Sequence, residues 1–330
     1  MLIIDNLPAI KKLNKDHWSK TQKKFDNLIK PVGSLAKLED ITCLYATAHM
    51  LENVVYPDKC LLLFVDEHGV ADEYPEKGLQ DIEIFSNQVK NSKSALDILA
   101  TSLNSKIQAV FLHEEFGRTN NIVKQEAMSE KQFMQAFVRG RKTAADIIKN
   151  GCTVLGLGNF SSGSNLSMPV LTMASFAKNY AQISIHEDLE KKKILDKIFA
   201  VHDCCEKNII ELTIKFGGFA IPAMAGAILQ AAGGGVPIFL DGSATLFAAY
   251  LACQIDSRAG AYLIAVSTTM EDGQNTLLKQ MGLSTMLDLK ISYPAGEASL
   301  FGLNLLDAGI KALNEMDSFG NVHFPLGDIN

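Results

Sequence analysis

The sequence predicts an α/β protein with a mostly parallel sheet flanked by helices. Five short apolar or β-branched runs, each as long as a buried strand, alternate with longer stretches of helical pattern. Glycine corners follow two of these runs, at Gly156-Leu157-Gly158 and at Asp241-Gly242. Such alternation is typical of βαβ units, and corners at the carboxyl ends of parallel strands are common ligand sites.

The elements can be placed in order along the chain. The first 30 residues are polar with a helical pattern interrupted only at Pro8, and a turn then leads into a helix that Ser34 is expected to cap. Strands are expected at residues 60–65, 107–112, 153–157, 236–240 and 262–266. Helices are expected at residues 35–51, 82–100, 129–149, 189–216, 219–230, 246–253, 274–289 and 300–315.

The bulk composition argues against several classes of protein. The formal net charge of -6 argues against a nucleic-acid-binding surface, and no apolar run reaches the roughly 18 residues of a membrane span. The first residues lack a basic leader with a long apolar run, so we expect a cytoplasmic protein. The 6 cysteines form no C-x-x-C pair and the 7 histidines no H-E-x-x-H motif, so we expect neither disulfides nor a bound metal.

The first glycine corner is the best candidate for binding an anion. Backbone N–H groups and hydroxyls at a strand end can hold a phosphate, and this stretch offers Gly156, Gly158, Asn159, Ser161, Ser162 and Gly163. The alternative is a flexible loop that joins a strand to a helix. At the second corner, Asp241 is most simply a turn residue before Gly242, while a ribose-binding or structural role stays open.

Several segments, taken in order, resemble one enzyme family. Two of them read Lys30-Pro31-Val32-Gly33-Ser34-Leu35, continuing to Leu38-Glu39, and Asp66-Glu67-His68-Gly69-Val70. Later segments read Gly217-Gly218-Phe219, Leu240-Asp241-Gly242 and Ala252-Cys253-Gln254-Ile255. From about residue 20 to residue 316 the chain resembles the nicotinate-nucleotide:dimethylbenzimidazole phosphoribosyltransferases. This family also includes phenol- and p-cresol-accepting enzymes built from two homologous subunits.

The resemblance implies a fold, a reaction and an assembly. It implies a large Rossmann-like domain at residues 36–285 and a small helical domain from residues 1–35 and 286–330. Phosphoribose would pass from nicotinate mononucleotide to an aromatic base such as dimethylbenzimidazole, giving an α-riboside phosphate for the lower ligand of a cobamide. No cofactor and no metal are implied, since the pyridinium leaves as a neutral ring. The assembly would be a homodimer, or a heterodimer with a homologous subunit.

The resemblance also implies roles for residues. Glu297, in Pro294-Ala295-Gly296-Glu297, is similar in position to the family's catalytic glutamate and would take the proton of the acceptor. In addition to the residues of the first glycine corner, the resemblance implies substrate or phosphate binding for Lys193, Gly217, Gly218, Asp241, Thr269 and Gly296. Acceptor binding is implied for Asp66, His68 and Ser86.

Alternatives remain for several of these residues. Glu297 could be a first-turn glutamate favoured by the helix dipole, and an ungapped alignment puts Ala295 at the catalytic position instead. Lys193 could face solvent, with the phosphate lysine one or two residues away. Asn159 stands where the family has a glutamate, and residues 74–78 differ from the usual acceptor-binding segment. The alternative function is therefore a weakly active or inactive subunit of a heteromeric phenol- or p-cresol-type enzyme.

Overall fold

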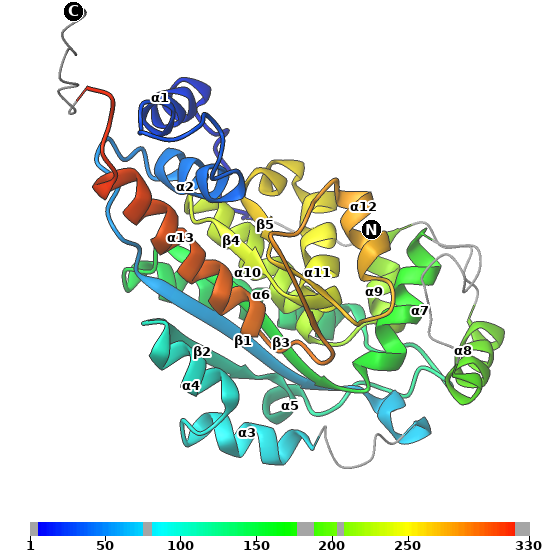
Figure 1. Cartoon of the computed structure of the whole chain (residues 1–330). Helices are drawn as coiled ribbons and strands as arrows, with labels where there is room; N and C mark the ends of the chain where they lie inside the picture. The colour runs from blue at the N-terminus through cyan, green and yellow to red at the C-terminus, as the bar shows by residue number, and fades with distance from the viewer. Residues whose placement is uncertain (1–5, 75–80, 177–187, 203–207, 321–330) are drawn as a thin grey trace, which may run out of the picture.

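The computed structural model describes residues 6–74, 81–176, 188–202 and 208–320. Its centre is a five-stranded sheet in the order β2-β1-β3-β4-β5, in which every neighbouring pair is parallel (Figure 1). The strands are β1 (Lys59–Glu67), β2 (Lys106–Phe111), β3 (Val154–Ser162), β4 (Ile238–Leu240) and β5 (Leu263–Ala265). The predicted α/β class is confirmed, and each of the five predicted strands is present.

The order of the strands reverses between β1 and β3. From β1 the chain goes outward to β2, and it then returns to β3 and continues to β4 and β5 on the other side. In open α/β sheets, a ligand crevice forms at the carboxyl ends of the strands where this reversal occurs. The fold therefore marks the ends of β1 and β3, at Glu67 and Ser162, as the first place to look for a site.

β3 is longer than the sequence predicts. It pairs with β1 from Val154 opposite Lys59 to Ser162 opposite Glu67. Residues 158–162, which were expected to form a loop, therefore belong to the strand. The alternative interpretation of this stretch as a flexible loop was wrong, because the hydrogen-bonded ladder with β1 continues through the glycines.

Helices cover both faces of the sheet, as alternating side chains require. On one face Leu62 and Phe64 belong to the core beneath α6 (Glu130–Lys149), α10 (Ala220–Gly233) and α11 (Gly242–Ile255). On the other face Leu61 and Leu63 belong to the core beneath α2 (Lys37–Ala48) and α13 (Glu297–Glu315). Figure 1 shows α13 lying along the sheet, with its first residues near the carboxyl ends of the strands.

The remaining elements connect these layers. They are α1 (Lys15–Asp26), η1 (Gly69–Glu73), α3 (Ile82–Lys90), α4 (Ala95–Ser102), α5 (Leu112–Phe116), α7 (Ser164–Phe176), α8 (Leu189–Val201), α9 (Ile209–Phe216), η3 (Ser257–Tyr262) and α12 (Gln274–Met281). The predicted helix at 189–216 corresponds to α8 and α9, and residues 203–207 between them lie outside the described residues.

Three expectations about helices were wrong. The predicted helix at 82–100 is two helices, because Ser94 and Asp97 form a capping box that starts α4. α2 begins at Lys37 after Ala36, so Ser34 does not cap it. The predicted helix at 274–289 ends at Met281, where Gly282 adopts a left-handed conformation with φ +64°. After that turn β7 (Leu287–Ile291) pairs in parallel with β6 (Ser267–Thr269).

The two ends of the described chain meet in a small core of their own. Phe25, Leu28 and Cys43 are buried there with Leu313 and Met316 from the end of α13 and the residue after it. α13 itself begins over the sheet and ends in this small core. The division into domains at residues 36–285 and at residues 1–35 with 286–330 stays a prediction. Within the described residues, no helix combines the length and apolar character that crossing a membrane requires.

Candidate active site

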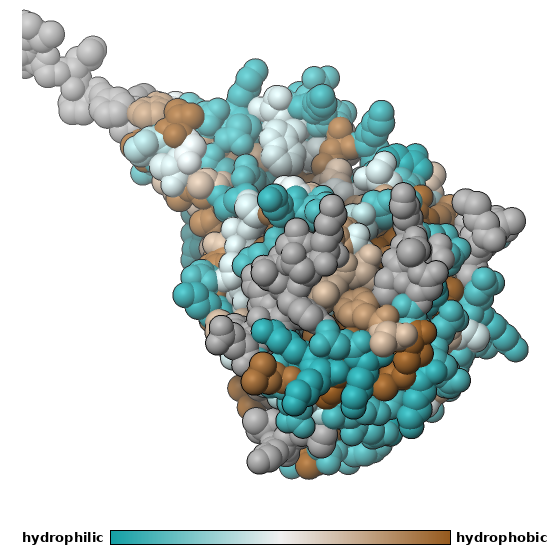
Figure 2. All heavy atoms as spheres, turned by 90° about the vertical axis from the view of Figure 1, so that its right-hand side faces the viewer, coloured by the Kyte–Doolittle hydropathy of each residue, from teal (hydrophilic) through white to brown (hydrophobic). Residues whose placement is uncertain are grey.

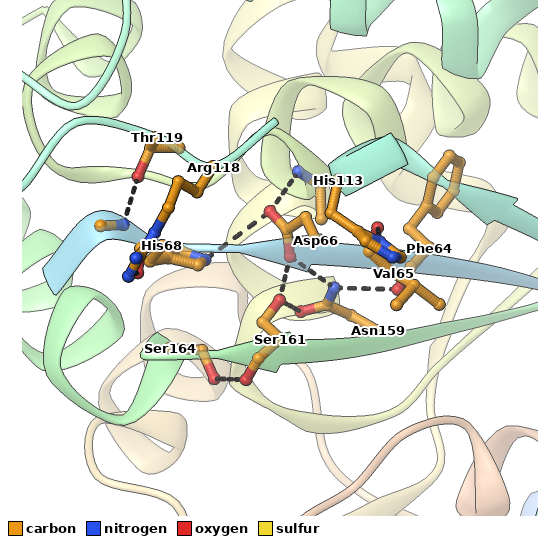
Figure 3. A network of polar contacts seen from close by, with 12 residues as sticks. Phe64, Val65, Asp66, His68, His113, Arg118, Thr119, Asn159, Ser161 and Ser164 are labelled. Atoms are coloured by element: carbon orange, nitrogen blue, oxygen red, sulfur yellow. Dashed lines mark hydrogen bonds and ion pairs between the residues drawn. The ribbon is translucent and has the colours of Figure 1, made fainter. Parts of the chain in front are cut away.

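A buried carboxylate network lies at the point where β1 and β3 diverge (Figure 3). Asp66 is fully buried, and its Oδ1 accepts hydrogen bonds from the hydroxyl of Ser161 and, at 3.4 Å, from the amide of Asn159. Its Oδ2 accepts the N–H of Ala220, the first residue of α10, at 2.9 Å. Asp66 therefore ties the ends of two strands to the start of a helix. Its carboxylate oxygens are already engaged inside the protein.

His68 belongs to the same network. Its Nε2 lies 3.6 Å from Asp66 Oδ2, and its backbone N–H donates to Ser162 O at 2.9 Å. Burial lowers the pKa of His68, while the charges of Asp66 and Glu67 act in the opposite direction. The imidazole is therefore neutral at neutral pH. A Cβ on Gly218 would lie 2.3 Å from His68 Nε2, so glycine is required there for the close approach of the α9–α10 connection.

Ser86 lies on α3, where its side chain is buried. Its hydroxyl lies 3.4 Å from His113 Nε2, and the ring of neighbouring Phe85 stacks on Phe160 with a centroid separation of 3.7 Å. Asp66, His68 and Ser86, which were predicted to contact the acceptor, are thus close to the site. None of them lines the cavity described next.

Two adjacent cavities lie beyond the carboxyl ends of β3, β4 and β6. The larger has a volume of about 290 Å³ and the smaller about 40 Å³, and Ser164, Glu271 and Tyr293 line both. The larger one is also lined by Tyr74, Asn165, Met168, Pro169, Asp188, Lys191, Ser243, Met270, Asp272 and Ser292. Figure 2 views the molecule from the side of α7, α8 and α12, where hydrophilic residues surround smaller hydrophobic patches. The position and size fit a small-molecule site.

Carboxyl groups gather at the inner end of these cavities. Asp241 is 2% exposed, lines the smaller cavity, and accepts the N–H of Ala298 at 2.9 Å through Oδ2. The pKa of Asp241 is raised to about 8, mainly by burial and also by the negative charges of Glu297 and Glu271, while the N–H groups of Ala298 and Gly296 act in the opposite direction. Asp241 is therefore largely protonated at neutral pH and holds the first turn of α13.

Glu297 is the first residue of α13 and is partly buried. Its Oε2 accepts the backbone N–H groups of Ala295 at 2.7 Å and Gly296 at 3.2 Å. Gly296, the N-cap, has φ +138°, a conformation that L side chains rarely adopt. The turn before α13 thus fixes one oxygen of the carboxylate, and the charge of Glu297 acts on Asp241, although Glu297 itself lines neither cavity.

Glu271 and Thr269 form a further pair at this end. Glu271 Oε2 accepts the N–H of Ser243 at 2.6 Å and the hydroxyl of Thr269 at 3.2 Å. Burial raises the pKa of Glu271, the hydrogen bonds from Ser243 and Thr269 act against this, and the charge of Asp272 adds to it. Thr269, predicted as a substrate residue, therefore orients a carboxylate of the cavity.

A lysine and a helix N-terminus occupy the outer part of the larger cavity. Lys191 of α8 lines it and forms an ion pair with Asp272, with 2.6 Å between Nζ and Oδ2. Ser164 and Asn165, in the first turn of α7, line it as well, and a helix N-terminus carries partial positive charge. Lys193, the predicted phosphate lysine, is exposed to solvent. Lys191, two residues earlier, lines the larger cavity instead.

The predicted glycine corner serves mainly to bring α13 close to the sheet. A Cβ on Gly158 would lie 2.0 Å from Ala295 O, and one on Gly156 would lie 3.1 Å from the Cβ of Ser299. These two glycines therefore pack beneath α13 and do not line either cavity. Asn159 and Ser161 line the smaller cavity, Ser162 accepts the N–H of His68, and Gly163 (φ +86°) makes the turn into α7. Gly217 ends α9 with its N–H bonded to Thr213 O.

Sequence reasoning missed Glu271 and Tyr293. A signal for Glu271 was available, because Glu271-Asp272-Gly273 is an acidic corner a few residues after the predicted strand at 262–266. Tyr293 lies in a turn after β7, which the sequence pattern did not predict. Residues 74–78 differ from the usual acceptor-binding segment. Of these, Tyr74 lines the larger cavity, and its hydroxyl donates a hydrogen bond to Asp188. Residues 75–80 lie outside the described residues.

Comparison with known proteins gives matches over most of the chain. A family model described as phosphoribosyltransferase matches residues 10–323. The nicotinate-nucleotide–dimethylbenzimidazole phosphoribosyltransferase of Geobacter metallireducens is 24% identical, with 96% of each chain covered. That of Clostridium perfringens is 25% identical over 96% of this chain and 94% of the relative. The crystal structure of the same enzyme from Thermus thermophilus superposes with a TM-score of 0.83 at 21% identity, covering 93% of this chain and 98% of that one. The resemblance read from the sequence is confirmed.

Proposed function

Because the chain belongs to the phosphoribosyltransferase family, we propose that it transfers phosphoribose from nicotinate mononucleotide to an aromatic base such as dimethylbenzimidazole. The product is an α-riboside 5′-phosphate for the lower ligand of a cobamide. The observation that supports the proposal is a cavity lined both by carboxyl groups and by a lysine near a helix N-terminus. The chain that forms this cavity matches its relatives over nearly its full length. Such a site can hold a phosphate at one end and accept a proton at the other.

The two ends of the cavity suggest how the nucleotide lies. The phosphate binds at the first turn of α7, where Ser164 and Asn165 line the cavity, and Lys191 supplies a positive charge. Lysine has three donors, so Lys191 can contact a phosphate while it keeps its ion pair with Asp272. The ribose then extends toward the carboxyl groups, and its anomeric carbon reaches the inner end of the cavity.

At that end the reaction requires one displacement and one proton transfer. The acceptor nitrogen forms a bond to the anomeric carbon, the bond to nicotinate breaks, and its electron pair returns to the pyridine ring. The proton of the acceptor passes to a carboxylate. Glu297 takes this role in the proposal, because its Oε1 accepts no hydrogen bond within the described part of the chain while Oε2 is held by two N–H groups. Asp241 positions it by holding the N–H of Ala298.

The acceptor and the assembly belong to the same proposal. Phe160, Tyr293 and Pro294 line the smaller cavity and offer flat or apolar surface to an aromatic ring. A dimer is proposed as well, either of two copies or with a homologous subunit. Asn159, where the family has a glutamate, favours testing whether a second subunit is needed, since an amide cannot act as a base.

An acceptor panel assayed on the purified chain tests the proposal. Nicotinate release from the mononucleotide is measured with dimethylbenzimidazole, benzimidazole, phenol and p-cresol, and the riboside product is identified by mass spectrometry. The proposed function predicts release that depends on at least one acceptor. Release only after a homologous subunit is added would favour the partner-subunit alternative, and no release in either case would contradict the proposal.

A further inference from the structure

We propose that Glu271 recognises the ribose of the substrate by accepting hydrogen bonds from its ring hydroxyls. The inference rests on the proposed function, and it names the group that selects a ribosyl over a deoxyribosyl phosphate. Glu271 follows β6 and is one of the three residues that line both cavities. A sugar placed between a phosphate at α7 and the inner end of the site therefore has to pass it.

The Glu271 side chain is oriented by contacts from Ser243 and Thr269. Ser243 N and the Thr269 hydroxyl both donate to Oε2, at 2.6 and 3.2 Å. The Ser243 side chain also forms a hydrogen bond to the carboxylate. A Cβ on Gly242 (φ +80°) would lie 2.8 Å from Oε2, so only glycine at this position leaves room for the carboxylate. The carboxylate is thus held in a fixed position where it lines both cavities, within reach of a donor from outside the protein.

The charge around Glu271 indicates which donor fits. Asp241, which carries a proton at neutral pH, lines the smaller cavity beside Glu271, and the charge of Asp272 is paired with Lys191, so a neutral polar group fits this corner. Asp241 Oδ1 is buried and has no hydrogen-bond partner among the described residues, which leaves a second polar atom unsatisfied at the same corner. Buried polar atoms require partners, and sugar hydroxyls are neutral groups that both donate and accept.

Calorimetric binding of ribose 5-phosphate and 2-deoxyribose 5-phosphate to the full chain tests this inference without requiring turnover. Wild type should bind the ribose form at least about tenfold more tightly, because a hydrogen bond to a charged group is lost with the 2-hydroxyl. Glu271→Gln should reduce the preference, and Glu271→Ala should reduce it to about threefold or less. The control variant Glu190→Gln removes one negative charge from an exposed position on α8, and it should keep the wild-type preference.

Several outcomes would overturn the inference. The inference would be wrong if wild type bound the two sugar phosphates with equal affinity or bound neither of them. This holds even if both Glu271 variants failed to fold. Retention of the preference in a folded Glu271→Ala protein would also contradict it. A ribose preference in a protein that releases no nicotinate with any acceptor would support the sugar site and count against the proposed function. Failure of the ribose-binding inference and failure of the proposed function are therefore distinguishable.

Discussion

Single carboxyl groups in and beside the cavities differ in protonation and hydrogen bonding because their surroundings differ. Asp241 is buried, has an unpartnered oxygen and carries a proton at neutral pH. Glu271 has one oxygen fixed by two donors, and Glu297 has one oxygen fixed by the backbone at the start of α13. From sequence alone Glu297 is predicted as the base and Asp241 as a turn or substrate-binding residue, but their protonation states could not be predicted, because burial and hydrogen bonding depend on tertiary packing.

We predict that Glu297→Gln lowers kcat by about 100-fold or more, because an amide cannot accept the acceptor's proton and general bases contribute roughly that much. The affinity for nicotinate mononucleotide should change by less than about threefold, because Glu297 is not assigned to nucleotide binding. Steady-state nicotinate release and calorimetric binding measure the two quantities. Glu315→Gln, at the exposed far end of the same helix, is the matched control. An unchanged kcat in Glu297→Gln would remove it as the base.

We predict that Asp241 makes the fold less stable as pH rises from about 4 to about 8. Its pKa is about 8 in the folded protein, while an unfolded Asp titrates near pH 4, so in this window the folded state holds the extra proton. The stabilising contribution is complete at low pH and is lost as pH rises through the folded pKa. Thermal melts at pH 5 and pH 8 should show a smaller loss of stability for Asp241→Asn than for wild type. Parallel changes in the two proteins would argue against a protonated Asp241.

Among the elements, α8 shows that a run of identical residues limits what can be predicted from sequence. Lys191-Lys192-Lys193 gave no means of deciding which lysine faces the site, because the register of the helix depends on what it packs against. In the structure Asp188 caps α8 through the N–H groups of Glu190 and Lys191, and this start directs Lys191 to the cavity. Lys193 then points to solvent.

This register of α8 predicts different effects for two lysines that lie two residues apart. Lys191→Gln should raise the KM for nicotinate mononucleotide by about tenfold or more, because a charge-assisted contact to phosphate is lost. Lys193→Gln should leave KM within about twofold, since an exposed charge contributes little. Initial-rate kinetics on both variants measures the difference. A larger effect of Lys193→Gln would restore the sequence-based assignment and contradict the proposed position of the phosphate.

β3 and α13 form the second pair of elements on which the site depends. Gly158 lets the Ala295–Gly296 turn approach the strand, since a Cβ there would lie 2.0 Å from a backbone oxygen. We predict that Gly158→Ala destabilises the protein by about 3 kcal/mol, at the upper end of overpacking effects, because backbone must move. Denaturant unfolding measures this loss. Gly260→Ala, where the nearest atom is Cys253 Sγ at 3.6 Å, should be close to neutral, and equal effects of the two changes would contradict this packing role.

At the level of the whole molecule, sequence predicted the layers better than the details of the site. All five strands of the main sheet were found from their apolar runs, because buried parallel strands have a strong local pattern. β6 and β7 were missed, since each is short and only partly buried. The site could be located to the carboxyl ends of the strands. Asn159, Ser161 and Asp241 of the smaller cavity were predicted, whereas most of the lining of the larger cavity was not, because it comes from segments of α7, α8 and the loops after β6 and β7 that only the fold brings together.

The most direct test of the account is a crystal structure with nicotinate mononucleotide bound. We predict the phosphate at Ser164, Asn165 and Lys191, the ribose hydroxyls at Glu271, and the anomeric carbon facing Glu297. A nucleotide bound at any other surface, or reversed in the cavity with its phosphate beside Asp241, would contradict the central claim that this cavity separates phosphate binding from proton transfer.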